Sequence, residues 1–304
     1  MNRTVLCVVE LEHYPKDVVA RAVWLAKLHK AELELVLSDP AMNYLGESFI
    51  YFADLQLLAD SVRDEQQEAL NELTAFAEGQ GVKVRASTSH ERPEAHMIAA
   101  KAEDCDALFV VKGTHWHSPT ERASLADTDW RLIRRLSAPL WFAKPAAWKD
   151  SPVIVAAVDP THSRDKEAVL DRKIIEAAQA IADKCDGNVL LLHTYQRLEE
   201  IGSRVTWKFK PEKLPIDDLD RKIQEEHRKT LTALAEECGV PDDAVHQLPG
   251  RAHELLPSFA RANGASLVVM GGLARSGIKQ RFVGSTAARV LDHLPCDMLI
   301  VRAS

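Results

Sequence analysis

The chain repeats its own plan, and this duplication constrains its fold more than any other sequence feature. The segment VLCVVE at 5–10 resembles IVAAVD at 154–159, which begins 149 residues later (5 and 154). LFVV at 108–111 resembles LVVM at 267–270, and SAPLWF at 137–142 resembles CDMLIV at 296–301, each 159 residues later (108 and 267, 137 and 296). The pattern therefore predicts two copies of one domain, the second with about ten extra residues.

The boundary between the copies is predicted from composition. Residues 145–152 (PAAWKDSP) carry a proline at each end and show no hydrophobic periodicity, which is typical of a linker. With 304 residues the chain is long enough for two ordinary domains. We therefore expect one domain at 1–144, a linker at 145–152, and a second domain at 153–304.

Each copy alternates short apolar runs with amphipathic stretches. The predicted strands are 4–10, 32–38, 83–88, 107–112 and 139–143, then 153–158, 188–194, 243–248, 266–271 and 297–302. The predicted helices are 16–30, 54–80, 93–103 and 127–136, then 166–185, 217–238, 252–263 and 285–293. Apolar strands without clean alternation indicate parallel strands buried on both faces. The fold class predicted is therefore α/β, with two tandem doubly wound, open, five-stranded parallel sheets of Rossmann-like form.

Charge, hydropathy and cysteine spacing argue against nucleic-acid binding, membrane insertion and a disulfide-rich fold. There are 45 acidic and 38 basic residues, giving a formal net charge of -7, whereas a general nucleic-acid binder needs a basic surface. No apolar run approaches the roughly 20 residues of a membrane span, and the first residues do not resemble a secretory signal. The five cysteines are widely spaced without a CxxC, which disfavours a disulfide framework. We expect a cytoplasmic protein that binds neither nucleic acid nor membrane.

Ligands of open parallel sheets lie beyond the carboxyl ends of the strands, so the residues there are the candidate site. In the second copy, Asp159 follows the first strand, and the fourth strand runs into a glycine-containing loop at 271–286. That loop ends in Gly284-Ser285-Thr286 at a helix start, where amides and the helix dipole favour an anion, and it carries Arg275 and Lys279. The pattern predicts a nucleotide with its phosphates at this loop and its nucleoside near Asp159. The alternative is an ordinary glycine turn followed by an N-cap.

The same residues resemble the universal stress protein family. Its ATP-binding branch has G-x2-G-x9-G-[S/T] after the fourth strand and an aspartate that contacts adenosine after the first. Gly271, Gly284 and Ser285 match that pattern, whereas Ala274 replaces the second glycine. The resemblance implies ATP or ADP, with Mg²⁺, as cofactor. It implies these binding residues: Asp159, Gly271, Gly272, Ala274, Arg275, Gly284, Ser285 and Thr286. Ala274 leaves weak or absent ATP binding as an alternative.

The tandem arrangement, with Thr128-Asp129-Trp130 and the stretch from Lys112 to His117, resembles the universal stress protein E subgroup. Single-copy members of the family pair through their last strands. The resemblance therefore implies that the two halves form a pseudo-dimer within one chain, and a further homodimer is an open alternative.

The first copy is predicted to have lost the nucleotide loop. With the offset of 159, Gly271 becomes Lys112, Ala274 becomes His115, Gly284 becomes Leu125 and Ser285 becomes Ala126. Glu10 occupies the position of Asp159. Asp127 and Asp129 would also repel phosphate. We therefore expect no nucleotide there in the family manner.

Three further features leave alternatives open. His115 and His117 are either zinc ligands or ordinary loop histidines, and His162 and His193 either line the site or act in it. The apolar segments 49–55 and 205–211 either cover the core or form a groove for a hydrophobic ligand.

The function predicted is a nucleotide-binding stress regulator without efficient turnover. The sequence contains no P-loop, and no catalytic or metal-binding residue is assigned. Two other classes stay open. One is a slow ATPase or self-phosphorylating protein that uses Ser285 or Thr286, and the other is a module that binds a hydrophobic small molecule.

Overall fold

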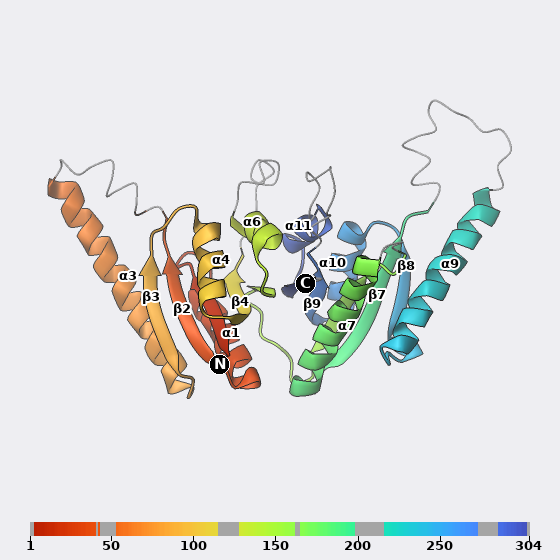
Figure 1. The fold of residues 1–304 in the computed structure, drawn as a ribbon, viewed down its shortest axis with the longest axis horizontal. Helices are drawn as coiled ribbons and strands as arrows, with labels where there is room; N and C mark the ends of the chain where they lie inside the picture. The colour runs from red at the N-terminus through yellow and green to blue at the C-terminus, as the bar shows by residue number, and fades with distance from the viewer. Residues whose placement is uncertain are drawn as a thin grey trace, which may run out of the picture. The chain divides into compact units, whose positions relative to one another are not determined.

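The computed structural model (Figure 1) describes residues 3–40, 42, 53–114, 128–161, 165–197, 216–272 and 285–302. The chain divides into two compact units, Met1–Ala146 and Ala147–Ser304, called unit 1 and unit 2 below. Each unit is a parallel sheet flanked by helices.

Unit 1 contains a five-stranded sheet in the order β3-β2-β1-β4-β5, with every neighbouring pair parallel. Its elements are β1 (Thr4–Val9), α1 (Pro15–His29), β2 (Glu32–Ser38), α3 (Ala53–Gly79), β3 (Val84–Ser89), α4 (Glu94–Asp104), β4 (Ala107–Gly113), α6 (Thr128–Arg135) and β5 (Leu140–Ala143).

Unit 2 repeats this arrangement, with parallel strands in the order β8-β7-β6-β9-β10. Its elements are β6 (Val153–Val158), α7 (Asp165–Cys185), β7 (Asn188–Tyr195), α9 (Ile216–Glu237), the 3-10 helix η1 (Asp242–Ala244), β8 (Val245–Pro249), α10 (Ala252–Ala262), β9 (Ala265–Gly271), α11 (Ser285–Leu291) and β10 (Asp297–Val301). The predicted fold class of two tandem open parallel sheets is confirmed, and every predicted element ends within two residues of the observed one.

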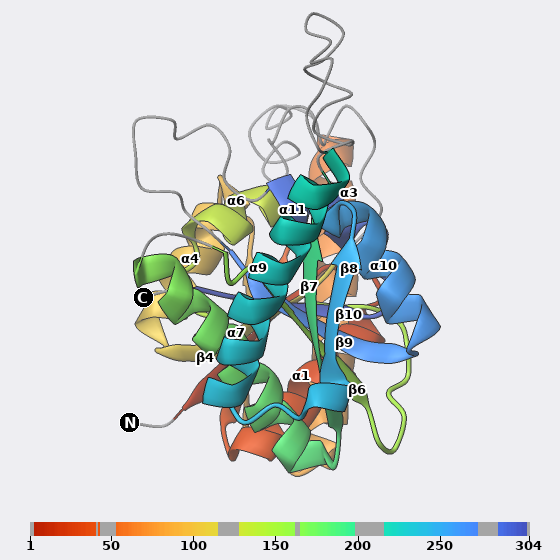
Figure 2. The same cartoon turned by 90° about the vertical axis from the view of Figure 1, so that its right-hand side faces the viewer.

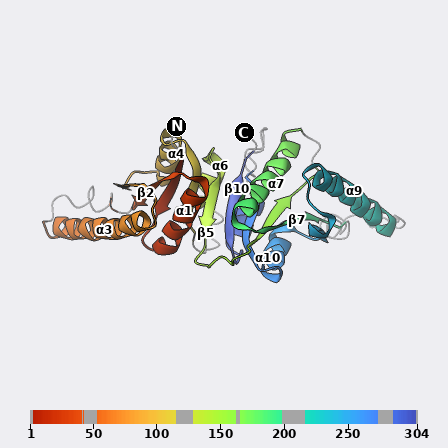
Figure 3. The ribbon, with the colours of Figure 1, turned by 90° about the horizontal axis from the view of Figure 1, so that it is seen from below.

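The sheets are covered on both faces, which explains why their strands are continuously apolar. In unit 2, α7 and α10 lie on opposite sides of the strands (Figure 3), and α9 runs along β7 and β8 (Figure 2). Val5 to Val9 of β1 are almost completely buried, as are Leu267 to Val269 of β9. A strand buried on both faces has no solvent side for polar residues, so alternation disappears.

Strand order reverses between β1 and β4 in unit 1 and between β6 and β9 in unit 2. At such a point the loops that leave neighbouring strands turn to opposite faces, which opens a crevice at the carboxyl ends. In the described part of the chain, no helix combines the length and apolar character that crossing a membrane requires.

Candidate functional site

Unit 2 has a pocket of about 420 Å³ at the carboxyl ends of β6, β7 and β9. Asp159, Gly271 and Thr286 line it, so the structure brings together three of the residues singled out in the sequence. Apolar residues of β6, α7, β7, β9 and α10 line it, together with polar residues of α7, β7, α9, α10 and α11. A concave site of this size with a few convergent polar groups suits a small molecule.

The position of Asp159 is fixed by a residue that the sequence did not reveal. Its backbone N–H donates to Oδ1 of Asp171 at 3.1 Å, and Asp171 is a buried carboxylate on α7. The Thr161 hydroxyl donates to Oδ1 of Asp159 at 2.8 Å. The Asp159 side chain itself is half exposed and faces the pocket, where it can accept hydrogen bonds from a ligand.

Gly271 and Gly272 serve the packing of the strand end. A Cβ on Gly271 would lie 2.6 Å from Cδ2 of Leu170, so this glycine lets α7 approach β9 closely. The Gly272 N–H donates to the carbonyl of Val301 at 2.8 Å, continuing the contact between β9 and β10. Ser285 begins α11 and Thr286 lines the pocket. Ala274, Arg275, Lys279 and Gly284 lie outside the described residues.

The start of α10 contributes a second group of donors, which sequence reasoning missed. Gly250 adopts φ 134°, and its N–H donates to the carbonyl of Tyr195 at 2.7 Å. Arg251 follows as the N-cap and makes no side-chain cap hydrogen bond, so the first amides of the helix are not satisfied by a cap. Arg251 and His253 both line the pocket. The signal that could have revealed this edge is Pro249-Gly250-Arg251 directly before an amphipathic helix.

Two histidines form a hydrogen-bonded pair beside the pocket, which His227 lines. Nε2 of His193, a fully buried side chain on β7, lies 2.7 Å from Nδ1 of His227 on α9. Nδ1 of His193 lies 3.1 Å from the Val158 carbonyl, which can only accept. When both rings are neutral, the Nδ1–H of His193 therefore donates to the Val158 carbonyl. Nε2 of His193 then accepts a hydrogen bond from the Nδ1–H of His227. Burial lowers the pKa of His227, against the opposing charge of Asp159, which favours this neutral arrangement.

The counterpart in unit 1 corrects one alignment made from sequence. Leu6 of β1 pairs with Val110, and Val155 of β6 pairs with Val268, so the offset between β4 and β9 is 158 residues (110 and 268), not 159. Gly113 therefore corresponds to Gly271. The expectation that Lys112 replaces that glycine is wrong, because the four-residue match of LFVV with LVVM gives 159, whereas strand pairing aligns ALFVVKG at 107–113 with ASLVVMG at 265–271. Lys112 instead corresponds to Met270.

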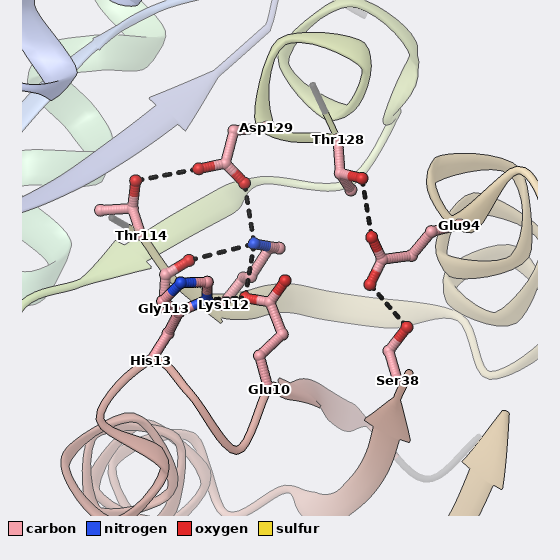
Figure 4. Close-up of polar contacts among 9 residues, drawn as sticks. All are labelled: Glu10, His13, Ser38, Glu94, Lys112, Gly113, Thr114, Thr128 and Asp129. Carbon is pink, nitrogen blue, oxygen red and sulfur yellow. Dashed lines mark hydrogen bonds and ion pairs between the residues drawn. The ribbon is translucent and has the colours of Figure 1, made fainter. Parts of the chain in front are cut away.

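Lys112 occupies a buried ion cluster beside the end of β1 (Figure 4). Its Nζ lies 2.6 Å from Oε2 of Glu10 and 2.9 Å from Oδ1 of Asp129, and it donates to the Gly113 carbonyl at 3.3 Å. Thr114 donates to the other oxygen of Asp129 at 2.9 Å. The Lys112 and Asp129 side chains are 1% and 0% exposed. We call Glu10, Lys112 and Asp129 the ion cluster.

Burial by itself would lower the pKa of Lys112, but the charges of Asp129 and Glu10 outweigh it and raise that pKa. Burial would likewise raise the pKa of Glu10, but Lys112 and the hydrogen bond from His13 together lower it. Both shifts keep Lys112 and Glu10 in their charged forms. Unit 1 therefore has a buried ammonium group at the position where unit 2 has the apolar side chain of Met270.

A second buried carboxylate lies nearby. The Ser38 hydroxyl donates to Oε1 of Glu94 at 2.5 Å, and the Thr128 hydroxyl donates to Oε2 at 2.7 Å (Figure 4). Glu94 begins α4, the counterpart of α10, so an acidic side chain stands where unit 2 presents the amides beside Arg251. His115 and His117, His162, and the segments 49–52 and 205–211 lie outside the described residues.

Comparison with known proteins is consistent with this architecture. The model of the universal stress protein family matches residues 1–144 and 152–302. The chain belongs to the universal stress protein family. Universal stress protein E of Escherichia coli K12 is 23% identical over 99% of this chain and 94% of its own length. The universal stress protein E homolog of Haemophilus influenzae is 21% identical, over 99% of this chain and 98% of its own.

Solved structures show the same fold over the whole chain. A functionally unknown protein from Pseudomonas aeruginosa PAO1 matches with a TM-score of 0.72 at 22% identity, covering 99% of this chain and 92% of its own. A universal stress protein from Archaeoglobus fulgidus DSM 4304 matches with a TM-score of 0.66 at 15% identity, covering 98% and 96%. The resemblance to the tandem, universal stress protein E-like form is confirmed, and membership of the family places the chain in the stress response.

Proposed function

We propose that this universal stress protein binds ATP or ADP, with Mg²⁺, in unit 2 and acts as a cytoplasmic regulator without efficient turnover. The observation that carries the proposal is the pocket at the strand-order reversal, with Asp159 on one side and the start of α10 on another. A carboxylate accepts hydrogen bonds from ribose hydroxyls, and the phosphates are expected at the loop from Gly271 to Thr286, as the sequence predicts. The amides at the start of α10, with Arg251, are a further group of donors for phosphate. The residues present therefore fit a nucleotide.

The two units support an asymmetric form of this proposal. In unit 1 the corresponding strand end carries Lys112 within the ion cluster, and Glu94 stands at the start of α4. A nucleotide phosphate there would meet Glu94 and the net negative charge of the cluster. We therefore expect one nucleotide per chain, held by unit 2.

A titration of the full chain with ATP and with ADP tests the proposal. Arg251→Gln and Asp159→Ala should each weaken binding at least about tenfold, since a charge-assisted hydrogen bond is worth roughly 1.5–3 kcal/mol. Arg261→Gln is the matched control, because Arg261 lies on the same helix but is exposed and outside the pocket. Two nucleotides per chain, or equal losses for Arg251→Gln and Arg261→Gln, would contradict the proposal.

Phosphate release distinguishes binding from catalysis. We expect turnover well below about 1 s⁻¹, the lower end of ordinary enzyme rates. Faster release that disappears in Asp159→Ala would support the ATPase alternative. Mass spectrometry of small molecules that co-purify with the chain would reveal a hydrophobic ligand instead.

Two expectations about the whole chain stay predictions. They are the pairing of the two halves through their last strands, as single-copy members of the family pair, and a division at 1–144, 145–152 and 153–304. Small-angle scattering that showed two independent domains on a flexible linker would contradict the pairing.

A further inference from the structure

Unit 1 has a pocket of its own, at the ends of β1 and β2 and the start of α4, with a volume of about 660 Å³. We call it the acidic pocket. Five carboxylates line it, and none of its described lining residues is a lysine or an arginine. The five are Glu10, Glu12, Asp39, Glu65 and Glu94. It occupies the position in unit 1 that the proposed nucleotide pocket occupies in unit 2.

An unsatisfied buried acceptor in its wall points to a ligand. Gln66 of α3 is 6% exposed and lines the acidic pocket. Its Nε2 donates to Oδ2 of Asp39 at 2.6 Å, which orients the amide. Oε1 is buried and has no hydrogen-bond partner. A buried acceptor without a donor costs about 1–3 kcal/mol, which a bound N–H group would recover.

The charges around the acidic pocket are compensated only in part. Glu10 shares the single positive charge of Lys112 with Asp129, so these three residues keep a net negative charge. His13 also lines the pocket and lies 3.3 Å from Glu10, whose hydrogen bond raises the pKa of His13, so a protonated His13 offsets part of that charge. Both oxygens of Glu94 accept from neutral hydroxyl groups, those of Ser38 and Thr128. A cation in the acidic pocket would therefore meet an attractive field from more than one side.

The spacing of these groups favours an organic cation over a metal ion. Within the residues that the structure describes, no three His, Cys, Asp or Glu side chains come close enough together to hold a metal. Carboxylates spread around about 660 Å³ instead suit several separated positive charges. Leu37, Val62 and Ala69 lie between them on the lining and can contact methylene groups.

We propose that the acidic pocket of unit 1 binds a linear aliphatic polyammonium ion. One ammonium group donates to Oε1 of Gln66 beside Asp39, a second lies near Glu10 and Glu94, and the methylene chain contacts the apolar part of the lining. This site is separate from the proposed nucleotide site, since all of its residues belong to unit 1.

Calorimetric titration of the full chain with spermidine, without nucleotide and at low salt, tests the proposal. We expect saturable binding of one spermidine per chain. Asp39→Asn, which keeps the size of the side chain and removes its charge, should raise the Kd at least about tenfold. Asp64→Asn is the matched control, because Asp64 is exposed on α3 and outside the pocket lining.

A second pair of variants tests the amide acceptor. Gln66→Leu should also raise the Kd, whereas Gln67→Leu, an exposed neighbour on the same helix, should leave it unchanged. If either pocket variant fails to fold by circular dichroism, Glu12→Gln tests the charge at an exposed position of the lining and should raise the Kd severalfold.

Three outcomes would overturn the proposal. The first is the absence of saturable binding at millimolar spermidine. The second is an equal effect of Asp39→Asn and Asp64→Asn, which would show attraction to the general negative charge of the chain. The third is equally tight binding of Mg²⁺ or of the monoamine butylamine, since neither carries the separated charges that the pocket requires.

Discussion

Replacing Lys112 by methionine should destabilise unit 1 strongly. At an effective dielectric constant of about 20, its contacts with Glu10 and Asp129 at 2.6 and 2.9 Å each carry roughly 6 kcal/mol of gross attraction. Most of that attraction offsets the cost of removing three charges from water. Removing the cation alone leaves the buried Asp129 and the partly buried Glu10 without their shared counter-charge, and the expected loss of unfolding free energy is about 3–5 kcal/mol.

The matched control comes from unit 2, which has Met270 at the position of Lys112 and, if the same offset of 158 is extended, Ala287 at the position of Asp129. The double variant Lys112→Met with Asp129→Ala removes the buried pair together. Replacing both members of a buried pair by apolar residues is often nearly neutral. We therefore expect the double variant to recover half or more of the loss caused by Lys112→Met.

Hydrogen exchange measured by mass spectrometry suits this comparison, because a chain of two units need not unfold in one step. Amides of β1 and β4 report the opening of unit 1, and those of β6 and β9 serve as the internal control. A loss below about 1 kcal/mol for Lys112→Met, or a double variant less stable than the single one, would refute the assignment of a stabilising ion cluster.

Four further predictions concern two glycines and the dependence of stability on pH. Gly113→Ala would place its Cβ 2.8 Å from a backbone carbonyl and should cost about 1–3 kcal/mol in chemical denaturation. Gly271→Ala meets the end of a leucine side chain and should cost less. The contribution of the ion cluster to the free energy of unfolding should be complete between pH 4.5 and pH 10.5, which are the ordinary pKa values of Glu10 and Lys112. Denaturation at several pH values should show that this contribution decreases in two ranges. It decreases when the pH drops through the lowered pKa of Glu10, and also when the pH rises through the raised pKa of Lys112. Because burial lowers the pKa of His227 from 6.5, unit 2 should lose stability as pH falls from 6.5 through that lowered pKa, and His227→Gln should lack this loss.

The sequence by itself determined the repeat, the helices and strands, and the edge of the sheet where Asp159 lies. These features depend on hydrophobic periodicity over short windows and on the rule that parallel strands end at one edge. The glycine positions of the first copy could not be read in the same way. A match of only four apolar residues gives an offset of 159, and the pairing of β1 with β4 and of β6 with β9 gives 158, which places Gly113 at the position of Gly271.

The tertiary structure alone decided which polar groups meet. Lys112 and Glu10 are 102 residues apart, and His193 meets His227 from a helix 34 residues later. Gln66 and Asp39 come together only because α3 crosses the end of β2. No local pattern specifies such contacts, since each depends on where a helix packs across the sheet. The charge of the pocket in each unit is therefore a property of the assembled fold, although every residue that creates it can be read in the chain.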